Sequence, residues 1–250
     1  MSNLVEDYSY RWENDEVLVE ITYSVAGVST TVVITSRFTG KMMLLDVGDG
    51  ALRDLLARGS IDFVNDIDVI AITHGHFDHM GGLYPLLGFM RMLGRSEPLN
   101  ILAPAGCVEV TNVVHAFRQA YHSTIPFRIF IHEVGNNTGF DTDFFKTEAV
   151  EVEHFGLENT SGEDRLMPAL GFRVRVGQTL VAYTGDTRYC EGAEKVVQNA
   201  DIAIIEATRT EAPEAGFRVH LSEEEAQRLG SLAKEFLLVH RLPASVINDG

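Results

Sequence analysis

The stretch that decides the fold is Thr73-His74-Gly75-His76-Phe77-Asp78-His79, in which four potential metal ligands lie within six residues. Because histidine supplies only nine of the 250 residues, a solvated polar loop is a poor explanation for three imidazoles so close together. In an extended segment alternate side chains share a face, so His74, His76 and Asp78 converge, whereas His79 begins the following turn. One short loop can therefore serve two neighbouring ions.

The types of ligand narrow the choice of metal. Imidazole nitrogens combined with carboxylate oxygens suit zinc best among the common metals, and manganese, iron and cobalt accept the same donors. The chain has only two cysteines, Cys107 and Cys190, which excludes a CxxC metal site and argues against a disulfide framework. We therefore expect two divalent ions held by histidines and carboxylates, with zinc as the first choice.

The sequence on either side of the motif predicts a strand, a loop and a helix. Ile67-Asp68-Val69-Ile70-Ala71-Ile72 is short and rich in β-branched residues, as a buried strand should be. Gly81-Gly82 then lead into an apolar segment, Leu83 to Leu93, that we expect to be helical. A polar loop between a strand and a helix is a usual position for a functional site in layered α/β proteins.

Strand-like segments recur in both halves of the chain, which predicts a sandwich with helices outside. A helix is expected at about 50–58, and the capping box at Ser222 predicts another that reaches Lys234 or Glu235. Residues 1–16 are polar and acidic and are expected to form a loose end, and 156–164 a polar loop. The length suits one domain. The predicted strands cover 17–23, 30–35, 42–47, 67–72, 169–176, 180–184, 201–206 and 236–239.

Composition and charge limit the classes of partner. No apolar stretch approaches the roughly 20 residues that cross a bilayer, and the amino terminus does not resemble a signal peptide, so we expect a soluble cytoplasmic protein with no membrane contact. The formal net charge of −16 disfavours extensive nucleic-acid binding unless the positive charges gather on one face. A small anionic substrate stays acceptable, because bound divalent ions cancel negative charge locally.

The HxHxDH arrangement, with Asp46-Val47-Gly48-Asp49-Gly50 before it, resembles the metallo-β-lactamase superfamily. This resemblance implies an α/β fold, the four-layer αββα sandwich, here as a single domain over residues 1–250. It also implies three further ligands in a fixed order: a lone histidine, a metal-bridging aspartate and a final histidine.

Candidates for all three ligands follow strand-like segments. His154 comes after 147–153, and Asp186 lies in a Gly-Asp-Thr segment after 180–184. For the last ligand both His220 and His240 are available, and we prefer His240 because it follows the buried strand 236–239. His115, His122 and His132 lie outside the pattern.

The resemblance then implies how the ligands divide between the ions. Asp78, close to the water between the ions, could also accept or orient a proton during catalysis. One ion takes His74, His76, His154 and Asp186, and the other takes Asp78, His79, Asp186 and His240.

Within the superfamily the chain most resembles ribonuclease Z and its phosphodiesterase relatives. The segments that carry this likeness are Ile205-Glu206-Ala207-Thr208, His220-Leu221-Ser222 and 238–243. By position, the Glu206 carboxylate would orient the His220 imidazole, which could bind a phosphate oxygen or protonate the leaving group. The alternative is a structural histidine at a helix entry beside Ser222.

Two departures separate this chain from bacterial ribonuclease Z enzymes. Those enzymes insert a long basic arm that grips transfer RNA, but His154 and Asp186 are only 32 positions apart here. The first position of the Ile205-to-Thr208 segment also holds isoleucine in place of histidine. We therefore expect a phosphodiesterase that acts on a small or single-stranded phosphodiester, and the resemblance suggests a homodimer.

Two other functions stay open at this point. The same metal cluster would polarise a carbonyl as readily as a phosphoryl oxygen, so a carboxylic ester, lactone or thioester hydrolase is the first alternative. A non-catalytic metal-binding module that has kept the fold is the second. A redox di-iron role is disfavoured, because the related oxygen-reducing branch has glutamate at the position of His76.

Overall fold

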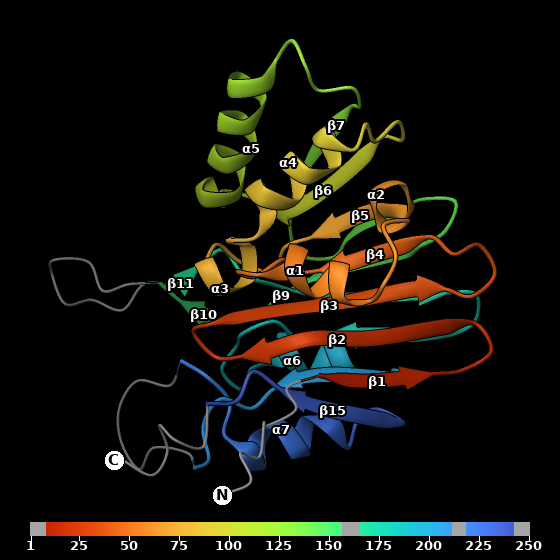
Figure 1. Ribbon diagram of the computed structural model, residues 1–250. Coiled ribbons are helices and arrows are strands. Elements are labelled where there is room, and N and C mark those ends of the chain that lie inside the picture. Colours follow the sequence, from red (N-terminus) through yellow and green to blue (C-terminus); the bar gives the residue numbers. More distant parts are fainter. Residues whose placement is uncertain (1–8, 157–165, 212–218, 243–250) are drawn as a thin grey trace, which may run out of the picture.

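The computed structural model describes residues 9–156, 166–211 and 219–242. In the first sheet the strands lie side by side in sequence order, from β1 near the bottom of Figure 1 to β7 near its top. Neighbours are antiparallel from β1 to β4 and parallel from β4 to β7. The strands are β1 (Tyr10–Glu13), β2 (Val17–Val25), β3 (Ser29–Ser36), β4 (Met42–Leu45), β5 (Ile67–Ala71), β6 (Leu99–Pro104) and β7 (Ile129–Val134).

The second sheet has the order β15-β14-β13-β12-β9-β8. Its strands β13, β14 and β15 are parallel, and the remaining neighbours are antiparallel. A short separate ribbon pairs β10 (His154–Phe155) with β11 (Leu166–Met167). The strands of the sheet are β8 (Thr138–Asp141), β9 (Lys146–Glu151), β12 (Leu170–Val176), β13 (Thr179–Tyr183), β14 (Ile202–Glu206) and β15 (Glu235–Val239).

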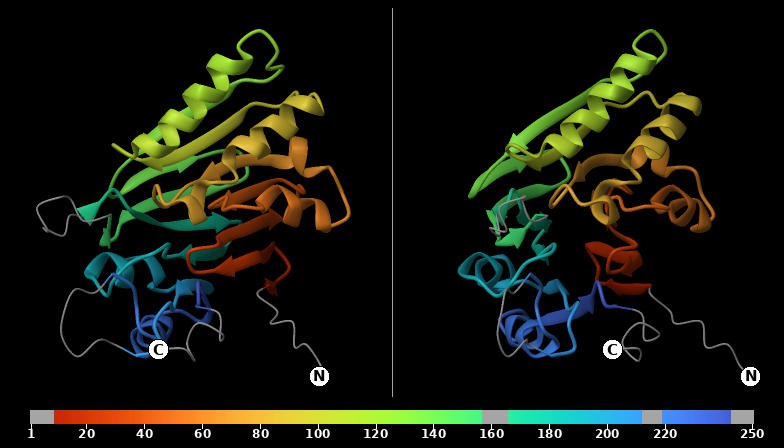
Figure 2. Two further views of the ribbon diagram at one scale, coloured as in Figure 1. Left: turned by 60° about the vertical axis from the view of Figure 1, so that its left-hand side comes forward. Right: turned by 90° about the vertical axis from the view of Figure 1, so that its left-hand side faces the viewer.

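Helices cover the outer face of each sheet, and they arise mainly where parallel strands need a crossover connection. Figure 2 shows the helices of the first half and those of the second half on opposite sides of the molecule. Against the first sheet lie α1 (Ala51–Ala57), α2 (Phe63–Asp66), α3 (Phe77–Met80), α4 (Leu83–Met92) and α5 (Val108–Tyr121), and against the second lie α6 (Glu191–Val197) and α7 (Glu223–Gly230).

Three apolar cores lie between these layers. One packs α1, α4 and α5 on the first sheet, and another packs α6 and α7 on the second. The third core lies between the sheets and joins residues such as Ile34 and Met43 to Phe172 and Val181. Alternate residues of one strand serve different cores, as Ile204 and Ile205 of β14 do. The predicted αββα sandwich is therefore confirmed.

Two predicted boundaries were wrong. The amino-terminal segment is not loose throughout, because Tyr10–Glu13 pairs antiparallel with β2, while residues 1–8 lie outside the described part. The helix that begins after Ser222 ends at Gly230, not at Lys234 or Glu235. A Cβ atom on Gly230 would lie 2.5 Å from the Phe236 ring, so the helix ends where the next strand packs against it. The predicted polar loop at 156–164 falls almost entirely outside the described residues.

Candidate metal centre

The centre lies where the parallel strands of both sheets end. After β5, Ile72 and Thr73 continue the chain into the motif, and His74 and His79 are completely buried. Strand ends from the second sheet contribute Asp186, Glu206 and His240. The carboxyl ends of parallel strands are the usual place for a site in open α/β sheets, because loops from several strands meet there.

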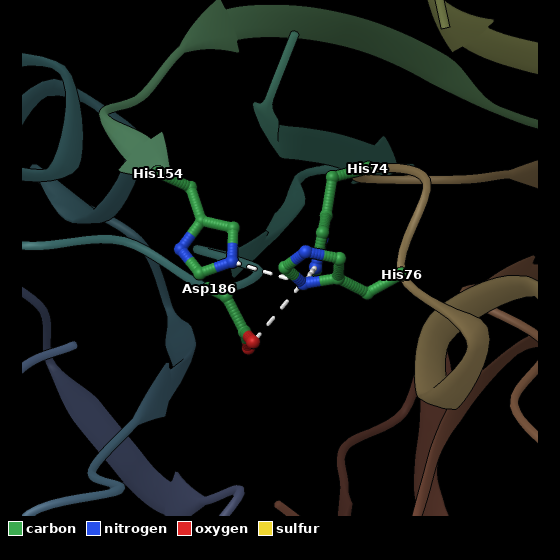
Figure 3. A group of neighbouring side chains, drawn as sticks. All are labelled: His74, His76, His154 and Asp186. Atoms are coloured by element: carbon green, nitrogen blue, oxygen red, sulfur yellow. Dashed lines mark hydrogen bonds and ion pairs between the residues drawn. The ribbon is translucent and has the colours of Figure 1, made fainter. Parts of the chain in front are cut away.

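The first group of side chains converges as Figure 3 shows. His76 Nδ1 lies 3.0 Å from His74 Nε2 and 3.2 Å from His154 Nε2. Asp186 Oδ2 lies 3.8 Å from His74 Nε2. The structure thus brings together His74, His76, His154 and Asp186, the four residues that the sequence assigned to one ion.

The second group consists of Asp78, His79 and His240. His240 Nε2 lies 3.3 Å from His79 Nε2 and 3.2 Å from Asp78 Oδ2. The turn between β2 and β3 also reaches this group, since the Gly27 N–H donates to Asp78 Oδ2 at 2.9 Å. His220 lies nearby, 3.8 Å from Asp186, and it forms a third cluster with Asp186 and His240.

Asp186 lies between the two groups. Its Oδ2 faces His74, whereas its Oδ1 lies 3.3 Å from His79 Nε2 and 3.4 Å from His240 Nδ1. The preceding Gly185 has φ 59°, and a Cβ atom there would lie 2.7 Å from the Thr73 side chain. Glycine is therefore required for the turn that places this carboxylate between the groups.

The buried imidazoles have their outer nitrogens fixed by oxygen atoms. His79 Nδ1 lies 2.7 Å from Asp46 Oδ2, and His154 Nδ1 lies 3.3 Å from the Val219 carbonyl oxygen. Hydroxyl oxygens contact the other two imidazoles. The Thr73 hydroxyl lies 3.0 Å from His74 Nδ1, and the Thr208 hydroxyl lies 2.9 Å from His240 Nδ1. Such contacts fix the tautomer and turn the other ring nitrogen toward the centre.

Asp46 organises the first of two carboxylate clusters. It accepts the Thr73 N–H at 2.7 Å and the Thr73 hydroxyl at 2.9 Å, besides its contact with His79. The Tyr183 hydroxyl donates to it at 2.8 Å. Asp46 and Thr73 both lie in motifs visible in the sequence, but their roles as hydrogen-bonding partners were not predicted, and Tyr183 was not predicted at the site. The position of Asp46 at a strand end was a usable signal, whereas Tyr183 had none.

Glu206 organises the second cluster and is also buried. Its Oε1 lies 2.9 Å from His220 Nδ1 and accepts the Thr187 N–H at 2.9 Å. Its Oε2 accepts the Thr208 hydroxyl at 2.8 Å. Burial lowers the pKa of His220, but the adjacent Glu206 carboxylate raises it more, to about 9. The pairing with Glu206 thus favours the protonated form of His220.

The sequence left two questions open about this second cluster: which group His220 contacts, and where the side chain of Ile205 lies. The Ser222 side chain forms its capping box with Glu225, and His220 turns instead toward Glu206. Ile205 is fully buried against the helix layer, on the opposite face of β14 from Glu206. Ile205 therefore does not line the centre.

The donor set fits divalent cations. Asp186 Oδ1 is buried without a hydrogen-bond partner among the described residues. Burial lowers the pKa of His154 to about 3, so its imidazole is neutral and offers a lone pair. Clustered imidazole nitrogens and carboxylate oxygens are the donors that zinc, manganese, iron and cobalt take in proteins. The remaining histidines lie elsewhere. His132, for example, forms a hydrogen bond with Asn100, and its ring lies tilted against that of Phe140.

Comparison with known proteins identifies the family. The family model described as the beta-lactamase superfamily domain matches residues 43–240. The chain belongs to the beta-lactamase superfamily. Curated relatives named ribonuclease Z include those of Pyrococcus abyssi, 26% identical over 84% of this chain and 80% of the relative, and Methanothermobacter thermautotrophicus, 28% identical over 83% and 79%.

Solved structures of the superfamily share this fold. The metallo-beta-lactamase fold protein YhfI from Bacillus subtilis is 19% identical with a TM-score of 0.71, covering 94% of this chain and 90% of that one. The short form of human tRNase Z is 23% identical with a TM-score of 0.67, covering 89% and 92%. Family membership and the clustered ligands together identify a metal-dependent hydrolase. Within the described residues, no helix is long and apolar enough to span a membrane.

Proposed function

We propose that this chain is a zinc phosphodiesterase with two ions, related to ribonuclease Z and acting on small or single-stranded phosphodiesters. The ribonuclease Z relatives, at 26% and 28% identity, support the reaction class. Asp186 would bridge the ions, since its two oxygens face different groups. His74, His76 and His154 would complete one ion's ligands, and Asp78, His79 and His240 the other's.

Bound divalent ions would supply an acidified water molecule and positive charge to neutralise the phosphoryl oxygens. The chain's own carboxylates complete the site. Burial raises the pKa of Asp78, but the adjacent imidazoles of His240 and His79 lower it by more, to about 2. The Asp78 carboxylate is therefore ionised at neutral pH, and the Gly27 N–H holds its Oδ2 in place. It can accept a proton from the attacking water.

The pairing of His220 with Glu206 is the observation that carries the phosphodiester assignment. The imidazole side chain is 21% exposed, at the edge of a set of proposed ligands of which all but His76 are buried. Glu206 holds Nδ1, which leaves Nε2 as the nitrogen that can present a proton. An alkyl leaving group needs such a proton, because it departs readily as an alcohol and poorly as an alkoxide anion. A protonated His220 also attracts a phosphate anion.

The preference for a small substrate rests on length and charge. His154 and Asp186 are 32 positions apart, too close for the long arm that bacterial ribonuclease Z enzymes insert there. The net charge of −16 further opposes contact with a long polyanion. We therefore assign short phosphodiesters to this site in preference to precursor transfer RNA.

The test compares substrates and two matched variants of the zinc-loaded protein. Bis(p-nitrophenyl) phosphate, an alkyl phosphodiester, a lactone, a thioester and a precursor transfer RNA are assayed in parallel. We expect phosphodiesters to be preferred, and His220→Ala to reduce alkyl phosphodiester turnover by about 100-fold, a typical general-acid contribution. His132→Ala, on β7 away from the centre, should leave turnover unchanged. Faster lactone or thioester hydrolysis would favour the esterase alternative, and a zinc-loaded protein without turnover of any substrate would favour the non-catalytic one.

A further inference from the structure

Thr208 occupies a position between the proposed metal ligands and the proposed proton donor. It lies two residues beyond the end of β14, and its hydroxyl oxygen has three polar neighbours. These are Glu206 Oε2 at 2.8 Å, His240 Nδ1 at 2.9 Å and the His240 carbonyl oxygen at 2.9 Å. The residue is 8% exposed, so water does not easily replace these contacts.

The direction of the hydrogen bonds follows from the chemistry of a hydroxyl group. It has one hydrogen to donate and can accept from others. A carboxylate is the strongest available acceptor, so the Thr208 hydroxyl donates to Glu206. Its oxygen then accepts the Nδ1–H of His240. Protonated Nδ1 leaves the lone pair of His240 on Nε2, which faces Asp78 and His79.

Glu206 is therefore shared by two imidazoles. His220 donates to it directly at 2.9 Å, and His240 reaches it through Thr208. We propose that Thr208 is a positioning residue that joins the His240 ligand to the Glu206 and His220 pair, so that one hydroxyl aligns both the second metal ion and the leaving-group proton. The leaving-group half of this proposal rests on the proposed function, whereas the His240 half does not.

The other side of the centre contains a matched arrangement. Thr73 contacts His74 Nδ1 through its hydroxyl oxygen and donates to Asp46, as Thr208 does to Glu206. Each threonine also donates its backbone N–H to the same carboxylate, at 2.7 Å for Thr73 and 3.2 Å for Thr208. However, the second imidazole on Asp46 is His79, a proposed ligand, and not His220. Thr73 is therefore a control that supports a metal ligand without a link to the proton donor.

Removing the Thr208 hydroxyl has two expected consequences. The Nδ1–H of His240 loses its acceptor oxygen, and loss of such an outer partner typically weakens metal binding by 10–100-fold. Oε2 of Glu206 loses the hydrogen bond from the Thr208 hydroxyl. Of its two contacts with residue 208, only the backbone N–H at 3.2 Å remains. The carboxylate can then rotate, and the His220 ring that it holds moves with it.

The experiment uses the full-length protein with three substitutions. Thr208→Val keeps the shape and removes the hydroxyl, Thr208→Ser restores the hydroxyl, and Thr73→Val is the matched control. Zinc affinity at both sites is measured by titration against a competing chelator. At saturating zinc, the ratio of kcat for an alkyl phosphodiester to kcat for bis(p-nitrophenyl) phosphate measures dependence on leaving-group protonation.

We expect Thr208→Val to weaken the binding of one zinc ion by 10–100-fold. We also expect it to lower the kcat ratio even when zinc is saturating. Thr208→Ser should restore both quantities. Thr73→Val should weaken zinc binding and leave the ratio unchanged. If Thr208→Val does not fold, as judged by circular dichroism, Thr208→Ala takes its place.

Three results would overturn the proposal. Unchanged zinc affinity in Thr208→Val would remove the link to His240. An unchanged kcat ratio would remove the link to His220, and an equal fall of the ratio in Thr73→Val would make the effect general to the centre. Should the unmodified protein cleave no phosphodiester, the proposed function fails by itself, and the zinc titration still decides the role of Thr208 at His240.

Discussion

Asp46 and Glu206 organise the two sides of the centre in the same way, yet their surroundings differ. Each carboxylate receives the N–H and the hydroxyl of one threonine and contacts one imidazole directly. Asp46, however, is closed in by His79 and Tyr183, both buried, whereas Glu206 holds the partly exposed His220. The comparison shows that the same bonding pattern can enclose one carboxylate among buried side chains and leave the other beside a partly exposed imidazole.

Removal of the metal ions should have the largest effect, because both sides depend on them. We expect chelation to abolish hydrolysis and to lower the midpoint of thermal unfolding, since an ion present at 1,000 times its Kd stabilises the native state by about 4 kcal/mol. Activity assays and calorimetry before and after chelation measure this, and added zinc should reverse it. If the chelated, metal-free protein kept its full activity, neither side of the centre would depend on metal ions for catalysis.

Asp46→Ala should mainly reduce stability. The substitution leaves His79, Tyr183 and Thr73 without their buried acceptor, and breaking a buried charged pair costs about 3–5 kcal/mol. Urea unfolding of the metal-free protein measures the loss. The neighbouring Asp49 is exposed, so Asp49→Ala is the matched control and should change the free energy of unfolding little. Equal stability of the two variants would show that Asp46 does not hold the framework.

Glu206→Gln should instead mainly reduce catalysis. The amide keeps one acceptor oxygen, so the fold survives, but it no longer carries the charge that keeps His220 protonated. We expect turnover of an alkyl phosphodiester to fall by about 100-fold, and that of bis(p-nitrophenyl) phosphate to fall less, in steady-state assays. Glu224→Gln, at an exposed position of α7, is the control. A loss of stability as large as that of Asp46→Ala would erase the distinction between the two clusters.

Tyr183→Phe should have the smallest effect. It removes one of the donors to Asp46, and a hydrogen bond of this kind contributes about 1 kcal/mol. Chemical unfolding should show this loss, with hydrolysis unchanged. A clear fall in kcat without a change in stability would mean that the Asp46 cluster also takes part in the reaction.

Much of the fold followed from local patterns. The buried strand before His74 and the strand-like and helix-like segments in both halves predicted a sandwich with helices outside. The likeness of the HxHxDH motif to a known superfamily supplied the αββα layers. The tertiary partners were harder to predict. Tyr183 and Asp46 are 137 positions apart and meet only because the two sheets face each other. A tyrosine in an apolar strand carries no local sign of such a contact.

The errors have similar physical causes. Tyr10–Glu13 is polar and short, and it becomes a strand only because the edge of β2 is available for pairing. Thr208 and His240 are 32 positions apart in sequence, and parallel pairing of β14 with β15 brings their strand ends together. The residue types of the centre and the pairing of Glu206 with His220 could be predicted from the sequence. The oxygens of Asp46 and Thr208 that orient His79 and His240 could not, since these contacts depend on how the strands pair.

The position of β15 has a consequence for protein synthesis. This strand lies at the edge of the second sheet and is followed directly by His240, the last of the proposed ligands in the chain. On the ribosome, Asp46 and the motif around His74 are made long before it, but domains generally fold as units. The core between the two sheets includes Val239 of β15, so the sandwich is complete only after this strand has been made. His240 therefore reaches the centre in the step that completes the fold, and the proposed ligand set is assembled only once the sandwich has closed.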